Sequence, residues 1–133
     1  MKELTTNEKQ ELLDQFGKRV IEHVRDTSLN ISMNIATGKT VNPILRKQYS
    51  GLSKLSDKEK ELVCDLLSET ITDTIYNFLD MFESYPDEMK LYISNSSGEY
   101  NMCDVSEKMG GKIAFEDEDG WIQKFSKVGR FIM

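Results

Sequence analysis

The stretch SDKEKELVCDLLSETITDTIYNFLDMFESYP, residues 56–86, decides the fold because it predicts one long helix. Ser56 and Glu59 match a capping box, in which two side chains bind free backbone N–H groups at the start of a helix. Apolar residues then recur at helical spacing: Val63, Leu66, Leu67, Ile71, Ile75, Phe78, Leu79 and Phe82. The segment 84–86 ends the pattern with a proline. We therefore expect a central helix over about residues 57–83, with a mostly buried apolar stripe.

A second helix is predicted at the N-terminus, where Thr5 and Glu8 match another capping box. Its apolar stripe consists of Leu13, Phe16, Val20, Ile21 and Val24. This pattern ends near Arg25, and residues 28–37 are ambiguous. They alternate apolar and polar residues as a strand does, but they also contain apolar pairs four residues apart and precede Gly38, a helix-ending residue. We favour a continued or kinked helix over the strand.

The rest of the chain predicts shorter elements. A short helix is expected from Pro43 to Tyr49, because proline suits the first helical turn. After residue 86 the pattern favours two strands, at residues 89–93 and 99–102, joined by a turn rich in Asn, Ser and Gly. Further elements are a helical turn at 104–107, a strand at 112–115 and a short helix formed by Trp121, Ile122, Phe125 and Val128.

These elements predict an α+β fold, with N-terminal helices packed on a small C-terminal antiparallel sheet. The length of 133 residues suits a single domain over residues 1–133.

The net charge of −6 conceals a division along the chain. Residues 1–60 carry 11 Lys and Arg against 8 Asp and Glu, whereas residues 61–119 carry 3 against 15. A segment this acidic repels nucleic acid and attracts basic partners. It is also compatible with a merely solubilising surface.

The chain has two cysteines, Cys64 and Cys103, in no paired motif, and its first residues lack the apolar core of a secretion signal. Reduced thiols and a cytoplasmic location are therefore expected. No apolar run is long enough to span a bilayer, and the long helix lacks the basic face of a membrane-lying helix. We expect no membrane partner.

No residue pattern indicates catalysis or a cofactor. The one histidine, His23, has no neighbouring cysteine or second histidine with which to hold a metal ion. Cys64 and Cys103 lack the basic environment of a reactive thiol. The run Glu116–Asp119 is acidic enough to suggest a cation site, but its consecutive acids do not follow the alternating ligands of a calcium loop. We therefore expect no metal site, no cofactor and no enzyme activity.

The C-terminal stretch resembles small acidic bacterial proteins of the immunity type, which neutralise a toxin delivered by competing bacteria. The resemblance is carried by the segment 104–126, above all by Glu118-Asp119-Gly120-Trp121-Ile122. The helical run 55–82 is similar in layout. This resemblance implies an inhibitor that binds another protein, and it transfers no catalytic residue.

The leading hypothesis is a non-enzymatic cytoplasmic inhibitor that blocks a basic protein, such as a nuclease toxin, through an acidic surface. The expected contact residues are Asp87, Glu88, Glu99, Asp104, Glu107, Glu116, Asp117, Glu118, Asp119 and Trp121. Tyr85, Tyr92 and Tyr100 are candidate aromatic anchors, and core packing is the alternative role of these rings and of Trp121. Two other functions remain open: a phage-type inhibitor of a host defence protein, and a small enzyme with paired carboxylates.

Overall fold

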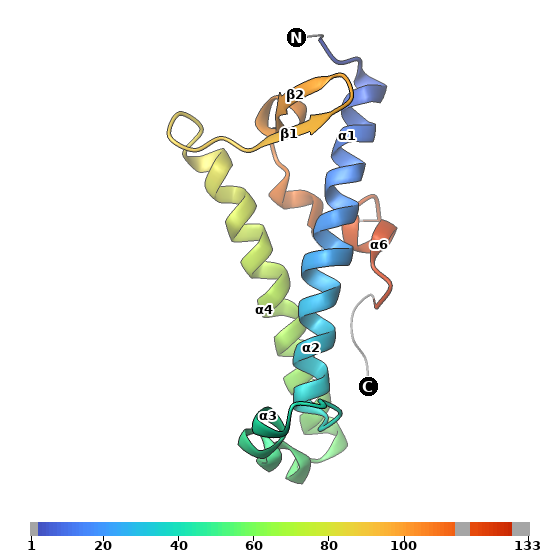
Figure 1. Cartoon of the computed structure of the whole chain (residues 1–133), viewed down its shortest axis with the longest axis vertical. Coiled ribbons are helices and arrows are strands. Elements are labelled where there is room, and N and C mark those ends of the chain that lie inside the picture. The colour runs from blue at the N-terminus through green and yellow to red at the C-terminus, as the bar shows by residue number, and fades with distance from the viewer. Residues whose placement is uncertain (1–2, 114–117, 129–133) are drawn as a thin grey trace.

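The computed structural model describes residues 3–113 and 118–128, and its fold is α+β with helices predominating (Figure 1). The N-terminal arm is a continuous helical rod made of α1 (Thr6–Arg19), a π-helical turn (Val20–Arg25) and α2 (Asp26–Ala36). The next long helix runs back beside α2, so the two arms form a helical hairpin.

The rod confirms that residues 28–37 continue the first helix rather than forming a strand. At its start, Thr5 and Glu8 make the predicted capping box, with both reciprocal hydrogen bonds at 3.1 Å. Just beyond its end, Gly38 adopts φ +76°, which residues with a Cβ atom avoid. The helix does not stop near Arg25, where a π turn lies instead.

This π turn explains why the buried face of the rod differs from the predicted stripe. Buried residues recur at every fourth position: Leu13, Gly17, Ile21, Arg25, Leu29 and Met33. In an ideal α-helix each four-residue step rotates the face by about 40°. A π turn contains more residues per turn than an α-helix, so it rotates the following residues less and partly cancels the rotation of the buried face. Arg25 consequently faces the core, and Val24, a member of the predicted stripe, is 45% exposed.

The second arm is α4 (Asp57–Ser84), which confirms the predicted central helix and begins with the capping box of Ser56 and Glu59. Most of its predicted stripe is buried or half-buried: Val63, Leu67, Ile71, Ile75, Leu79 and Phe82. Leu66 and Phe78 depart from the prediction, with 68% and 55% of their surface exposed. The segments packed against α4 cover a narrower face than its apolar stripe occupies.

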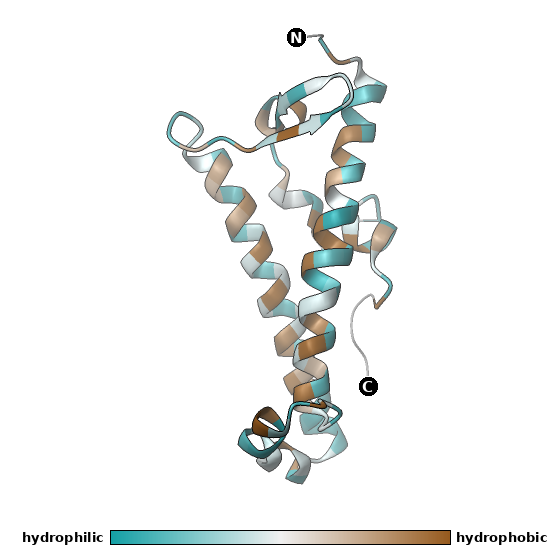
Figure 2. Cartoon of the chain, in the orientation of Figure 1, coloured by the Kyte–Doolittle hydropathy of each residue, from teal (hydrophilic) through white to brown (hydrophobic). Residues whose placement is uncertain are grey.

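A compact base joins the two arms. It contains α3 (Pro43–Gln48), which confirms the short helix predicted there, and a 3-10 turn (Ser50–Lys54). The Asn42 side chain caps α3 by accepting hydrogen bonds from the backbone N–H groups of Ile44 and Leu45, at 3.0 and 3.3 Å. Figure 2 shows apolar residues on α3 as well as along the arms.

The predicted sheet is a two-stranded antiparallel hairpin at the opposite end of the molecule from the base (Figure 1). Strand β1 (Tyr92–Asn95) pairs with β2 (Gly98–Asn101), and Ile93 lies opposite Tyr100. The strands thus lie closer to the turn than predicted, because the pairing extends to Asn95 and Gly98, and residues 89–91 are not in the sheet. Tyr100 is buried in the core between the hairpin and the helices. The sheet therefore closes one end of the helical hairpin.

The chain after the hairpin returns through short helical segments. The helical turn predicted at residues 104–107 lies slightly earlier, as α5 (Met102–Val105). The strand predicted at 112–115 is wrong at its first two residues, which lie in a 3-10 turn (Gly110–Ile113) packed against α4. Lys112 donates its backbone N–H to the Met109 carbonyl, Gly110 donates its own to Glu83 Oε1 of α4, and Ile113 is buried, so this segment needs no partner strand. The other two residues lie outside the described ranges.

The short helix predicted near the C-terminus is present as α6 (Trp121–Phe125), and it packs against α1. Trp121 is 1% exposed and meets the ring of Phe16 edge-on, with centroids 5.7 Å apart. Its ring lies directly over Gly17, where a Cβ atom would overlap Nε1 and Cε2. The buried Nε1 has no hydrogen-bond partner among the described residues. Gly17 is therefore required by packing.

A buried ion pair joins both arms and the C-terminal segment. The Arg25 guanidinium donates to Asp26 Oδ1 at 3.1 Å and also to hydroxyls of α4 and the C-terminal segment: Thr72, Ser68 and Ser126. Asp26 in turn accepts hydrogen bonds from Ser126 Oγ and from the backbone N–H of Lys127, both at 2.8 Å. Burial lowers the pKa of Arg25, whereas the negative charge of Asp26 and its hydrogen bond raise it in part.

We predict that Gly17→Ala lowers the free energy of unfolding by about 1–3 kcal/mol, because the new methyl group displaces the Trp121 ring. Urea denaturation measures the change. Gly51→Ala is the matched control, since no atom lies within 4 Å of the added Cβ, and it should shift stability by less than about 0.5 kcal/mol. Equal stability of Gly17→Ala and the wild type would refute the packing described here.

We also predict that Arg25→Met destabilises the fold by about 3–5 kcal/mol, because it leaves the Asp26 carboxylate buried without its cation. The double variant Arg25→Met with Asp26→Asn should lose less than the sum of the single changes, as a double-mutant cycle in urea would measure. Lys18→Met removes the exposed ion pair with Glu22 and should cost less than about 1 kcal/mol. Additive effects at Arg25 and Asp26 would contradict the coupling.

Candidate functional site

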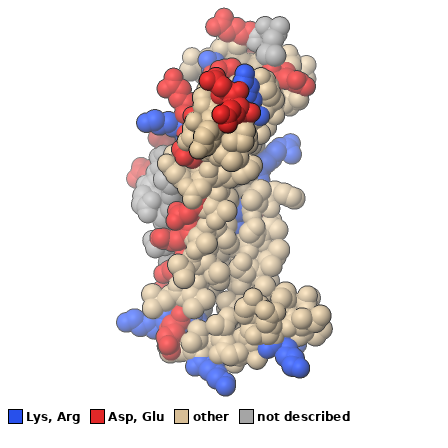
Figure 3. Space-filling view, turned by 90° about the vertical axis from the view of Figure 1, so that its left-hand side faces the viewer, with Lys and Arg blue, Asp and Glu red and all other residues tan. Residues whose placement is uncertain are grey.

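The structure gathers half of the predicted contact residues around the hairpin end. These are the exposed carboxylates Asp87 and Glu88 after α4, Glu99 on β2, Asp104 on α5 and Glu107 just beyond it. We call this group the acidic end. Figure 3 shows acidic side chains over the upper part of one face and down one edge, with some basic side chains among them, and mainly basic side chains around the base.

The remaining predicted carboxylates do not join this group. Glu118 and Asp119 are exposed just before α6, which lies against α1 and apart from the hairpin (Figure 1). Glu116 and Asp117 fall outside the described residues. The predicted site is therefore divided between the hairpin end and the start of α6.

The aromatic candidates separate into core and surface residues. Trp121 was predicted as a contact residue, but it is 1% exposed between α6 and α1, so we correct its role to core packing. Tyr100 is also buried, and its hydroxyl lies 2.8 Å from Ser97 Oγ. Tyr85 and Tyr92 are 53% and 52% exposed at the acidic end. They are the two proposed anchors that a partner can reach.

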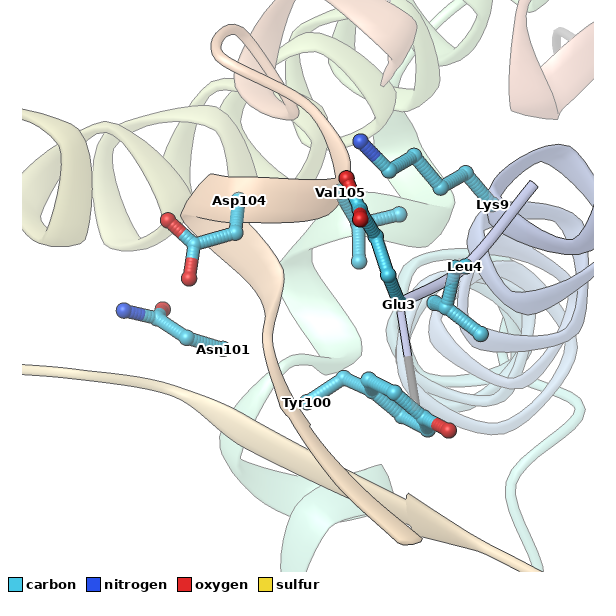
Figure 4. Close-up of a pocket in the computed structure, with 7 residues that line it drawn as sticks. All are labelled: Glu3, Leu4, Lys9, Tyr100, Asn101, Asp104 and Val105. Atoms are coloured by element: carbon cyan, nitrogen blue, oxygen red, sulfur yellow. The ribbon is translucent and has the colours of Figure 1, made fainter. Parts of the chain in front are cut away.

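A pocket of about 250 Å³ opens at the acidic end. It lies between the N-terminal segment with α1 on one side and β2 with α5 on the other (Figure 4). Its lining residues are Glu3, Leu4, Lys9, Tyr100, Asn101, Asp104 and Val105. Asp104 thus contributes both to the acidic end and to the pocket.

The chemistry of this pocket suits a long cationic side chain. Leu4, Val105 and the ring of Tyr100 offer apolar surface for an aliphatic stem, and Glu3 and Asp104 offer carboxylates for its charged group. Lys9 also lines the pocket and reduces its negative charge. The lining is thus complementary in shape and charge to a lysine or arginine side chain.

No pattern in the sequence pointed to the N-terminal half of this pocket. Glu3, Leu4 and Lys9 lie about a hundred positions away from α5 in the chain, and they belong to a predominantly basic segment. The packing of α1 against α5 brings them to the acidic end. An analysis of local charge alone could not assign them to the same surface.

The other candidate reactive residues lie away from this site or carry no activating partner. His23 is exposed on the π turn. Burial raises the pKa of the Cys64 thiol, and the charge of Asp65 adds to the effect. Burial also raises the pKa of Cys103, with Glu83 and Asp104 contributing, and its Sγ donates to the Phe82 carbonyl at 3.7 Å. Both environments favour the protonated thiol, which is a poor nucleophile.

Within residues 3–113 and 118–128, no group of three or more His, Cys, Asp or Glu side chains is placed to hold a metal ion. Among the same residues, no helix has both the length and the apolar character that crossing a membrane requires.

We predict that both thiols react slowly with a disulfide reagent at about pH 8, close to the ordinary cysteine pKa. A raised pKa leaves less thiolate at that pH, so the reaction accelerates only at higher pH. Cys64, which is 1% exposed, should react only after denaturation. Reaction rates of Cys64→Ala and Cys103→Ala variants separate the two sites. A native-state rate equal to that of a free cysteine would contradict these environments.

Comparison with known proteins adds no relative. No protein-family model matches the chain, and searches of curated proteins and of solved structures also find no match. The resemblance of residues 104–126 to immunity-type proteins therefore stays a prediction.

Proposed function

We propose that this protein is a non-enzymatic cytoplasmic inhibitor of the immunity type, which neutralises a basic protein such as a nuclease toxin. The observation that supports the proposal most is the acidic end, where five exposed carboxylates from four chain segments surround the hairpin. A nuclease must carry a cationic groove to hold its substrate. A protein that covers such a groove with carboxylates would compete with nucleic acid for it.

The pocket and the exposed tyrosines supply the short-range part of this proposal. A lysine or arginine of the partner would place its stem against Leu4 and Val105 and its charge near Asp104. Tyr85 and Tyr92 would provide aromatic contact area beside the carboxylates. Charge would then govern the rate of association. The contacts of the pocket and the two tyrosines, once buried against the partner, would govern the lifetime of the complex.

The same charge distribution argues against other partners for this surface. Carboxylates repel the phosphates of nucleic acid and of anionic lipids, so the acidic end is suited to neither. A phage-type inhibitor of a host defence protein would use the same chemistry and remains the second reading. We do not favour the enzyme hypothesis, since Glu3 and Asp104 of the pocket are exposed to solvent.

We predict that Glu99→Lys with Asp104→Lys slows association with the basic partner by about tenfold or more at low salt. The partner is first isolated by capture on the tagged wild-type protein from the cells that make it, and binding rates are then measured at several salt concentrations. Added salt should weaken wild-type binding, because exposed charges are screened.

Glu61→Lys with Asp73→Lys is the matched control, since both residues are exposed on α4 and the net charge changes equally. This variant should keep most of the wild-type association rate. If both variants slow association equally, the change in net charge alone explains the effect, and the acidic end is not the contact surface. The proposed surface would be refuted if neither added salt nor the substitutions at Glu99 and Asp104 changed binding.

A further inference from the structure

The base of the molecule combines features opposite to those of the acidic end. Residues 27–56 contain four cations and no acidic residue, and the cations are Lys39, Arg46, Lys47 and Lys54. Between residues 37 and 54, three apolar or aromatic residues are strongly exposed, with Val41 at 91%, Ile44 at 74% and Tyr49 at 42%. We call residues 37–54 the basic tip.

The basic tip is a formed structure that holds these side chains outward. The Asn42 cap and Pro43 begin α3, and both the Nε and Nη2 atoms of Arg46 donate to the Thr40 carbonyl, at 3.2 and 2.7 Å. Val41 lies in the loop that these bonds close, Ile44 lies in the first turn of α3, and both side chains are exposed. Pro43, Ile44 and Lys47, together with Gln48, also border an open hollow in the surface. Exposed apolar side chains that are rimmed by polar and charged residues are typical of interaction surfaces.

We propose that the basic tip docks on the surface of an anionic phospholipid bilayer, with Val41 and Ile44 entering the interface and the cations contacting lipid phosphates. Apolar side chains surrounded by Lys and Arg are the chemistry of interfacial membrane binding. A soft lipid surface accepts protruding side chains without a matching pocket, which a protein partner would have to supply. The expectation of no membrane partner rested on the lack of a spanning apolar run and on the long helix, which carries no row of cations. Docking by the basic tip involves neither, so the proposal revises that expectation.

The shape of the molecule favours end-on docking. The basic tip and the acidic end lie at opposite ends of the arms (Figure 1), and the 28 residues of α4 span about 42 Å. This separation is several times the Debye length of about 8 Å at physiological salt, so repulsion between the carboxylates and the bilayer is screened. Docking at the tip would leave the acidic end directed away from the membrane.

Vesicle co-sedimentation tests the proposal with the full chain. We expect binding to vesicles of phosphatidylcholine with about a quarter phosphatidylserine, and little binding to phosphatidylcholine alone. Lys39→Ala with Lys47→Ala should weaken binding about 25-fold, at about fivefold for each cation. Val41→Ser with Ile44→Ser should weaken it by about tenfold or more. Circular dichroism confirms that each variant keeps its helices.

Lys18→Ala with Lys108→Ala is the matched control, since it removes two exposed cations outside the tip. It should retain wild-type affinity for the mixed vesicles. Absence of binding to them at low salt, or equal weakening by the control, would overturn the proposal. Light scattering gives a further test: a dimer abolished by Val41→Ser with Ile44→Ser would show that a second copy covers the tip instead. The acidic end takes no part in these measurements, so their failure leaves the proposed function untouched.

Discussion

The buried pair of Arg25 and Asp26 is the constraint on which the rest of the structure depends. A guanidinium that is 1% exposed must have its hydrogen bonds satisfied inside the protein, and it finds acceptors on α4 and on the segment after α6. The π turn that ends at Arg25 brings this residue to the core side of the rod. One polar group thus fixes how both arms and the C-terminal segment meet.

Two apolar clusters lie on either side of this pair. One surrounds the hairpin, α6 and the start of the rod, and the other lies between α2 and the lower part of α4. Ile71 packs against both clusters, between the two α4 residues, Ser68 and Thr72, that accept from Arg25. A buried ion pair contributes little net stability compared with apolar packing, but it penalises any arrangement that leaves a charge unpaired. The pair therefore disfavours any register of the arms that separates Arg25 from its acceptors on α4.

The arms separate two surfaces of opposite character. The hairpin closes one end and presents carboxylates and a small pocket, whereas the loop between α2 and α4 presents cations and apolar side chains at the other. A shorter helical hairpin would let these charges compensate each other within one Debye length. The length of α4 keeps them electrostatically distinct.

The sequence by itself determined the helices, their caps, the hairpin and the division of charge, because these depend on residues only a few positions apart. Capping boxes at Thr5 and Ser56 and the apolar period of α4 are local signals of this kind. Only the tertiary structure decided the burial of Arg25 and Trp121 and the exposure of Val24 and Phe78, since burial depends on which distant segment covers a side chain. The same reason applies to the pocket: its N-terminal residues and α5 meet only through the packing of α1.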